Sequence, residues 1–423
     1  MAATETPRYP HAAYRASRQL VPSPAVDESA ILTVFVGLYN GAEWLDGLLA
    51  QIEAQEIASA RWVFVDNASA DDSWERVSAW AATTTLDVTL VRNAFNLGGT
   101  GSIFVNLDLI TTDWLAFMHQ DDIYLPNHFS TLANAAAGAT DDTVGIFSEM
   151  GRVNQDGKRI GAYPPASWMV PDLDPATVFL GLVRNHFIPW PTIAFRTAPF
   201  GAAESPWHST AFPDTEVTLK LAARGRFVHL PVETMRYRDN PGSESRVIDG
   251  RERQFGATLS LTRTFQTPEF EIIARGVVPA EREAFALALK DAILVRLGES
   301  DRATLVVAGA FERLIQFWDR TEPRVLAELR NLYDGIGAAA TSSLLDRMTT
   351  AAGGSSLAAF PEPVEGSPAP AGDAVVADRG AAVRLWERVG YLVPRFVRRP
   401  LSTGAIRVMT RGHERSAWRY EWR

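Results

Sequence analysis

Short apolar runs alternate with amphipathic stretches through the first third of the chain. Each apolar run is bounded by polar turn residues, which is typical of strands that are buried on both faces of a parallel sheet. We therefore expect strands at residues 31–37, 61–65, 87–91, 114–118 and 144–147.

Helices are predicted between these strands, because apolar residues there recur at helical spacing. After the first run, apolar side chains from Trp44 to Ile52 fall on one face, and Asn40 is placed to cap that helix with Glu43 three residues later. Strands that alternate with helices predict an α/β fold with a mostly parallel, twisted sheet covered on both faces. Further helices are expected at residues 73–81, around Ile103, Leu107 and Ile110, and from Pro126 onward.

Polar clusters follow three of the predicted strands. They are Tyr39-Asn40, Asp66-Asn67 and the segment from His119 to Asp122. Open α/β sheets bind ligands at the carboxyl ends of their strands, so a single site can collect all three clusters.

The rest of the chain shows several changes of pattern. A hairpin is expected to turn at Asp156-Gly157, and residues 217–230 read as a helix, a glycine stop and a strand. Residues 251–352 are helical in pattern and are expected to form a separate module. We divide the chain into a flexible arm (1–29), a sheet domain (30–250), the helical module (251–352), a Pro/Ala/Gly-rich linker (353–380) and a basic amphipathic tail (381–423).

Composition excludes several classes of function. A length of 423 residues predicts two or three domains, and a net charge of -9 argues against a general nucleic-acid binder. The chain has no cysteine, so disulfides, zinc knuckles and thiol catalysis are excluded. No secretory signal and no apolar run long enough to span a bilayer is visible, and we expect a cytoplasmic protein.

Four segments in order resemble the second family of glycosyltransferases, which have the GT-A fold. They are a strand followed by Tyr-Asn and a helix, a strand with an acidic turn, a glycine-rich helix start followed by an aspartate motif, and a later acidic helix start. In this chain the segments are VFVGLYNGAEWLDGLLAQIEAQ, FVDNASADDSWERV, NAFNLGGTGSIFVN with WLAFMHQDDIYLPNH, and FPDTEVTLKLAARGRFVHLPVETMRYRDNPGSES.

The resemblance implies an inverting, metal-dependent glycosyltransferase that moves a sugar from a nucleotide-diphosphate sugar to an acceptor hydroxyl. The acceptor is expected to be a glycan or a lipid-linked molecule, in envelope polysaccharide or glycoconjugate synthesis. Two alternatives stay open: a non-catalytic protein that binds nucleotide sugars or glycans, and a sugar-nucleotide nucleotidyltransferase. A nucleotidyltransferase would need a basic, glycine-rich loop after the first strand. This chain has GLYNGAEW there, which argues against that alternative.

Asp121 and Asp122 are the metal-ligand candidates, for Mn²⁺ or Mg²⁺. These ions prefer oxygen ligands and often contact one or two carboxylates besides phosphate. The other interpretation is that the two residues cap the helix near Pro126. The family's motif usually starts with an aspartate where this chain has His119, which is left to bind ribose or phosphate, or to pack.

The resemblance assigns further residues to the donor. Asp66 is expected to read the nucleotide base, with Tyr39 and Asn40 on the other side of the base. Asn96 and the glycines after it are expected to pack near the donor, because glycines there allow close backbone approach. In the alternative interpretation, Asp66 is only a turn residue and Asn40 is only a helix cap.

On the acceptor side, the resemblance makes Asp214 the catalytic base, with Glu216 as the fallback. Trp190 is placed either to stack on an acceptor sugar or to fill the core. Arg238, with Arg236 and Arg246, is a candidate partner of the diphosphate, or a surface arginine.

The tail interleaves arginines with aromatic and aliphatic residues. Such a pattern is typical of a helix at a membrane interface, and it predicts peripheral contact with the inner membrane face. Docking on the catalytic domain is the equal alternative. Oligomeric state, donor sugar and acceptor are not readable from these patterns.

Overall fold

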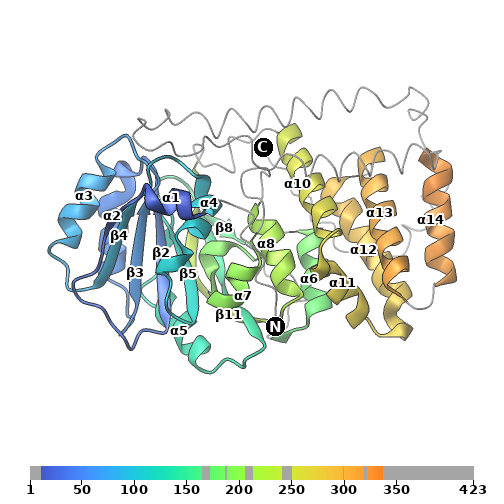
Figure 1. The fold of residues 1–423 in the computed structure, drawn as a ribbon, viewed down its shortest axis with the longest axis horizontal. Helices are drawn as coiled ribbons and strands as arrows, with labels where there is room; N and C mark the ends of the chain where they lie inside the picture. Colours follow the sequence, from blue (N-terminus) through green and yellow to red (C-terminus); the bar gives the residue numbers. More distant parts are fainter. Residues whose placement is uncertain are drawn as a thin grey trace.

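The protein is described by a computed structural model, which covers residues 11–163, 172–185, 188–204, 213–240, 250–298, 300–318 and 322–336. One mixed sheet forms its centre, with helices on both faces and a helical region at one end (Figure 1). The strands follow the order β1-β4-β3-β2-β5-β10-β7-β11-β6.

The first half of the sheet is parallel, as the apolar runs predict. It consists of β4 (Asp87–Arg92), β3 (Arg61–Asp66), β2 (Leu32–Leu38) and β5 (Trp114–His119). Along β2, Leu32, Val34 and Val36 enter one apolar cluster and Phe35 enters the cluster on the opposite face. Because both faces are covered, β2, β3 and β5 are apolar at most positions, whereas β4 also contains Asp87, Thr89 and Arg92.

The second half mixes directions. Strand β10 (Ile193–Arg196) lies antiparallel between β5 and β7 (Thr143–Val153), and β11 (Arg226–Arg238) runs parallel to β7. The shorter strands are β6 (Ile123–Tyr124), β8 (Arg159–Ala162) and β9 (Asp172–Leu173). The β7–β8 pair confirms the predicted hairpin: Gly157 has φ 78° and donates its N–H to the Asn154 carbonyl at 3.0 Å.

Helices cover each face of the sheet. One apolar cluster contains side chains of α2 (Ala42–Glu53), α3 (Ser73–Ala81) and α5 (His128–Ala137). The other contains side chains of α4 (Gly98–Val105), α6 (Pro175–Arg184), α7 (Thr197–Ala202) and α8 (Pro213–Ala222). The predicted α/β fold with a mostly parallel sheet is confirmed, and short 3₁₀ turns lie at Leu107–Leu109, Trp190–Thr192 and Pro279–Glu281.

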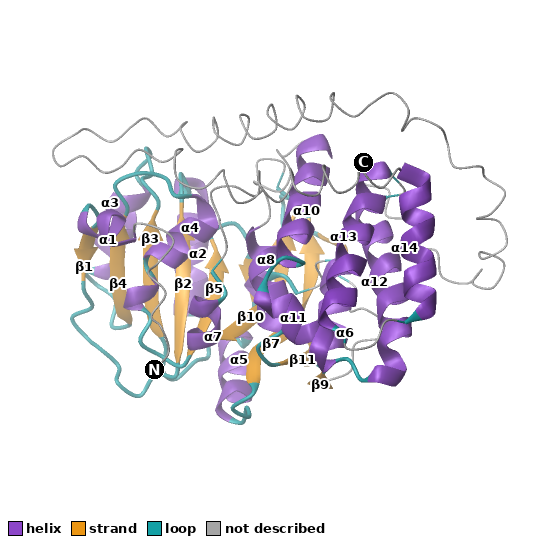
Figure 2. Cartoon of the chain, turned by 45° about the vertical axis from the view of Figure 1, so that its right-hand side comes forward, coloured by secondary structure: helices purple, strands orange, loops and turns teal. Residues whose placement is uncertain are grey.

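The predicted C-terminal helical region is present, and it shares an apolar cluster with the sheet domain. Its helices are α10 (Gly250–Thr264), α11 (Pro268–Gly276), α12 (Arg282–Leu297), α13 (Asp301–Phe317) and α14 (Pro323–Ile336). Their apolar residues belong to the same cluster as α6 and α8, and Phe270 of α11 stacks on Phe179 of α6 with ring centroids 5.6 Å apart. Figure 2 shows these helices side by side against the end of the sheet.

The described part of the predicted arm packs on the sheet. Helix α1 (His11–Ala16) and strand β1 (Gln19–Val21) dock on the sheet, with β1 antiparallel to β4. Tyr14 is buried and packs edge-on against Phe95. Among the described helices, none has the length and apolar character to cross a membrane. The predicted linker and tail lie outside the described residues.

Candidate active site

The three predicted polar clusters meet at the carboxyl ends of β2, β3 and β5. Tyr39 after β2 and Gln120 after β5 exchange two hydrogen bonds: Tyr39 N–H donates to Gln120 Oε1 at 3.0 Å, and Gln120 Nε2 donates to the Tyr39 carbonyl at 3.1 Å. The loop after β3 joins them, because Asn40 N–H donates to Ser69 Oγ at 2.9 Å. The Tyr39 side chain itself is exposed.

Asn40 does not cap α2, contrary to the prediction. It has φ 46°, a left-handed conformation that asparagine tolerates better than most residues, and its Oδ1 accepts the Ala70 N–H at 2.8 Å. The first N–H of α2, at Ala42, is instead bound by Asp71 Oδ2 at 3.0 Å. Asn40 thus ties two loops of the site together.

Asp66 ends β3 and is fully buried. Its Oδ2 accepts the Ser69 N–H at 3.2 Å and lies 3.2 Å from Arg92 Nε, while its Oδ1 has no hydrogen-bond partner among the described residues. Burial raises the pKa of Asp66, and the hydrogen bonds from Ser69 and the charge of Arg92 oppose that rise. A buried carboxylate oxygen without a donor is costly, so this atom is suited to an incoming N–H.

Asn96 belongs to a network of asparagines below the glycine-rich turn. Its Oδ1 accepts from Asn67 Nδ2 at 2.6 Å and from the Gly98 N–H at 2.8 Å. Asn93 Nδ2 donates to Asn67 Oδ1 at 3.0 Å, and Asn106 Nδ2 donates to Asn93 Oδ1 at 3.2 Å. The network fixes the turn from β4 into α4, where Gly98 has φ 71°.

The aspartate motif follows β5. Asp121 is partly exposed, and its Oδ2 accepts a long hydrogen bond of 3.4 Å from Asn240 Nδ2. Asp122 is buried, its Oδ1 accepts the Arg238 N–H at 2.9 Å, and its Oδ2 lies 3.7 Å from His119 Nδ1. Burial, and then the neighbouring charge of Asp121, raises the pKa of Asp122 well above its usual range.

Arg238 contacts this motif from β11, and its role toward the diphosphate stays a prediction. Its Nε donates to the Asp121 carbonyl at 2.8 Å, its Nη1 donates to the Gln155 carbonyl, and its guanidinium lies 5.2 Å from the Trp44 ring centroid. Arg236 is likewise engaged, 3.3 Å from Glu233, and Arg246 lies outside the described residues.

The motif fits a divalent cation through Asp121. The described residues contain no group of three or more His, Cys, Asp or Glu side chains that could hold a metal ion alone. An ion that completes its shell with diphosphate oxygens needs only one or two carboxylates. Asp121 is accessible for this, whereas Asp122 would have to turn outward to become a ligand.

Asp214 and Glu216 have different surroundings at the start of α8. Asp214 is partly exposed, and its Oδ1 accepts the Thr215 N–H at 2.8 Å. Glu216 is buried, 3.7 Å from Arg263 of α10. Of the two carboxylates, Asp214 is therefore the accessible one. Arg296 of α12 lies within the field of Asp214, which raises the pKa of Arg296 against the larger lowering effect of burial.

Trp190 is a core residue, as the second of its two sequence interpretations expects, and not a surface residue open to an acceptor sugar. It is 6% exposed, stacks on Phe117 with centroids 5.1 Å apart, and packs edge-on against Phe195. Its Nε1 donates to Thr218 Oγ1 at 3.0 Å, so its polar atom is also used inside the protein.

Two contributors were missed by sequence reasoning. Gln120 bridges β5 to Tyr39, and a Cβ on Gly41 would collide with the Gln120 side chain, so that glycine allows the bridge. Arg92 pairs with Asp66 and donates from Nη2 to the Ser69 carbonyl at 3.0 Å. Gln120 could have been found from the sequence, because it lies inside the aspartate motif.

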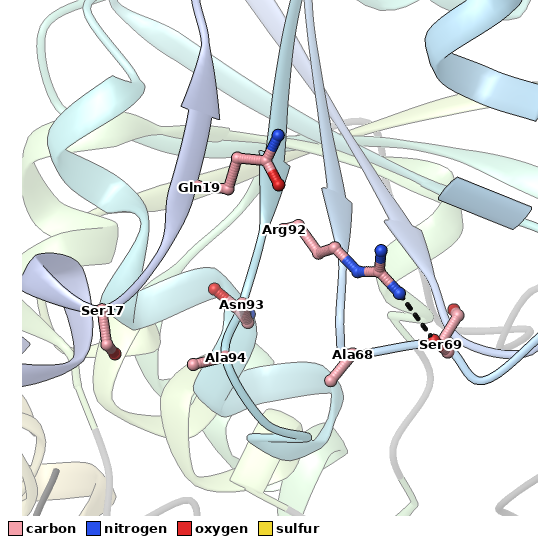
Figure 3. Close-up of a pocket in the computed structure, with 7 residues that line it drawn as sticks. All are labelled: Ser17, Gln19, Ala68, Ser69, Arg92, Asn93 and Ala94. Atoms are coloured by element: carbon pink, nitrogen blue, oxygen red, sulfur yellow. Dashed lines mark hydrogen bonds between the residues drawn. The ribbon is translucent and has the colours of Figure 1, made fainter. Parts of the chain in front are cut away.

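A polar pocket of about 280 Å³ lies beside Asp66 (Figure 3). The loop after β3 supplies Ala68 and Ser69, and the end of β4 supplies Arg92, Asn93 and Ala94. The remaining wall comes from the docked N-terminal segment, as Ser17 and Gln19.

Comparison with known proteins gives a family match for part of the chain. Residues 33–197 match the family model Glycosyl transferase family 2. The match includes Asp66 and Asp121 but ends before Asp214. No curated protein sequence matches the chain.

Several solved structures are similar in fold. S. aureus TarS 1-349 is 16% identical with a TM-score of 0.45, covering 68% of this chain and 88% of that chain. The mannosyltransferase PcManGT from Pyrobaculum calidifontis, solved with GDP-Man and Mn²⁺, is 16% identical with a TM-score of 0.44, covering 79% of this chain and 88% of that one. Glucosyl-3-phosphoglycerate synthase from Mycobacterium tuberculosis is 13% identical with a TM-score of 0.36, covering 57% and 81%. Likenesses this distant do not indicate what this chain binds. The family match confirms the resemblance drawn from the sequence motifs over residues 33–197, which match the glycosyltransferase family 2 model.

Proposed function

We propose that this chain transfers a sugar from a nucleotide-diphosphate sugar to an acceptor hydroxyl, with inversion at the anomeric carbon. The observation that carries the proposal is the convergence of Tyr39, Asp66 and Asp121 at the carboxyl ends of three adjacent parallel strands. This edge of an α/β sheet is where nucleotide ligands bind.

The donor is held in this proposal by its base and its diphosphate. A base N–H satisfies the unpartnered Oδ1 of Asp66, which requires the site to open at that atom, because Asp66 is buried. The exposed ring of Tyr39 flanks the base, and His119 at the end of β5 faces ribose or phosphate. Asp121 would hold Mn²⁺ or Mg²⁺, and such an ion would supply positive charge to stabilise the leaving diphosphate.

Asp214 acts as the base in this mechanism. Inversion is a single displacement: the acceptor oxygen forms the new glycosidic bond as the bond to the nucleotide diphosphate breaks, and the acceptor proton passes to the Asp214 carboxylate. The N–H of Thr215 orients that carboxylate, and the start of α8 holds it rigidly. Glu216 is paired with Arg263 inside the protein and stabilises the packing of α8 on α10.

Synthesis of an envelope polysaccharide or glycoconjugate is the setting we propose. A glycan or a lipid-linked acceptor would enter on the side of Asp214. A non-catalytic nucleotide-sugar binding protein is the second candidate. It is favoured by His119, which stands where the family usually has an aspartate.

Turnover and donor binding of two variants test the proposal. We expect Asp214→Asn to lower the turnover number by ~10²–10⁴ while donor affinity persists, because the side chain keeps its shape and loses its basicity. Glu216→Gln, two positions further along the same helix, is the matched control and is expected to reduce stability more than turnover. If the wild-type protein binds the donor but neither hydrolyses it nor transfers its sugar, the binding-protein alternative is favoured. Near-normal turnover for Asp214→Asn would refute the assignment of the base.

A further inference from the structure

The pocket beside Asp66 is built in part by residues that precede the family domain. Two of its lining residues, Ser69 and Arg92, also contact Asp66 Oδ2. The pocket is therefore next to the carboxylate to which we assign the nucleobase. Ser17 and Gln19 also line it, whereas the family match begins at residue 33.

The N-terminal segment is held firmly enough to form a binding wall. Arg15 Nε donates to the Val105 carbonyl at 2.6 Å, and Arg18 reaches Asp108 through two nitrogens at 2.9 and 2.8 Å. In the β1–β4 ladder, Gln19 lies directly opposite Arg92. These contacts hold the backbone on both sides of Gln19 in place, and the exposed Gln19 side chain lines the pocket from there.

Gln19 is the lining side chain whose polar atoms remain available. The Arg92 guanidinium is engaged by Asp66 and by the Ser69 carbonyl, and Asn93 is used by the asparagine network. Ser17 donates to the Tyr14 carbonyl at 2.9 Å. Within the described part of the chain, no hydrogen bond engages the Gln19 amide, and Figure 3 shows it on the strand beside Arg92 while Arg92 reaches toward Ser69.

We infer that Gln19 reads the edge of the donor's nucleobase and sets which nucleotide the site prefers. The inference rests on the proposed function, because it needs the base to lie at Asp66. A primary amide offers one acceptor and two donor hydrogens, and it can match the mixed donors and acceptors of a base edge in a way that Asp66, an acceptor alone, does not. Base selection then depends on a segment outside the glycosyltransferase family 2 domain.

Calorimetric titration with UDP, GDP and dTDP in the presence of manganese tests this inference. The full-length wild-type chain is compared with Gln19→Ala and Gln19→Glu, and with Leu20→Ala as the matched control, since Leu20 is the exposed neighbour on β1 that does not line the pocket. We expect both Gln19 variants to change the ratio of Kd values between the preferred nucleotide and the next by about three- to tenfold, the range of one hydrogen bond. Leu20→Ala should leave that ratio unchanged.

The outcomes separate this inference from the proposed function. If wild-type protein binds nucleotides and the Gln19 variants keep its ratio of Kd values, Gln19 does not read the base and only the inference fails. If the Gln19 variants bind all three nucleotides more weakly by the same factor, Gln19 contacts a part that the nucleotides share, and the inference is overturned. If the wild-type protein binds all three with equal affinity, no base is read, and the inference is overturned as well. Wild-type protein that binds none of the three would overturn the proposed function as well.

Discussion

His128 is a buried, neutral histidine, and its substitution should change how the stability of the protein depends on pH. It starts α5, is fully buried, and shares a hydrogen bond of 2.6 Å between Nδ1 and Thr234 Oγ1. Thr234 Oγ1 in turn lies 2.6 Å from Ser148 Oγ, so helix α5 is joined to β11 and β7. The His128 ring packs edge-on against Tyr124.

The magnitude follows from the burial of that ring. Burial lowers the pKa of His128 from 6.5 to about 3, and the backbone at Pro191 opposes this only weakly. The unfolded chain therefore binds one more proton than the folded chain between these two values, so stability rises with pH through this window and is lost as pH falls through it. Between pH 7 and pH 5 the loss attributable to this group is about 2 kcal/mol.

Urea unfolding at pH 7 and pH 5 measures the effect. His128→Asn keeps a polar atom near the position of Nδ1 and removes the titration. The variant should be less stable than wild type at pH 7, because packing is lost, yet its free energy of unfolding should fall by about 2 kcal/mol less between the two pH values.

Phe129→Leu is the control, since it disturbs the same buried cluster without removing a titratable group. It should lower stability at both pH values and keep the full wild-type pH dependence. If wild type and His128→Asn lose the same free energy between pH 7 and pH 5, His128 does not carry a depressed pKa and the reasoning is wrong.

Other predictions concern the site, the core and the tail. Asp121→Ala should abolish turnover with an unchanged melting temperature, and excess EDTA should do the same to wild type; full turnover in either case contradicts the metal assignment. Trp190→Phe should lower the free energy of unfolding by about 1 kcal/mol through the lost hydrogen bond to Thr218, with donor and acceptor affinities unchanged; weaker acceptor binding at wild-type stability would restore a sugar-stacking role. Full-length protein should float with anionic liposomes better than a chain ending at Gly380, and equal flotation would count against membrane contact through the tail.

The sheet was predictable because the burial of its strands on both faces requires apolar runs in the sequence. A strand covered on both faces has to be apolar at most positions, and β2, β3 and β5 are. Their order along the chain and the polar residues directly after them were enough to place the site at one edge of the sheet. Asp66 and the aspartate motif are where those patterns predict.

Roles that depend on side-chain direction were less predictable. Asn40 has the residue type and spacing of a helix cap, but its left-handed backbone turns the side chain toward Ala70. Trp190 lies between two prolines in an irregular stretch, which suits an exposed loop as well as a core residue. Only tertiary packing against Phe117 decides between these two environments.

The packing partners of the arm and of the helical module were not predictable, for a related reason. Residues 11–21 are too short to show periodicity, so the sequence does not show that Tyr14 is buried or that β1 pairs with β4. The helices after residue 250 have an ordinary amphipathic pattern, which shows that one face is buried but not against which partner. That partner is largely the sheet domain itself, through α6 and α8.

This shared core has a consequence for catalysis. The donor side of the proposed site rests on the ends of parallel strands, whereas Asp214 rests on α8, and α8 is held by α10 through the buried contact of Glu216 with Arg263. The C-terminal turn of α12 is tied to the same assembly, because Gln254 Nε2 of α10 donates to the Leu297 carbonyl at 2.9 Å and the adjacent Arg296 lies in the field of Asp214. Changes in the helical region should therefore alter turnover before they alter nucleotide affinity, since they shift the base and leave the strand ends in place.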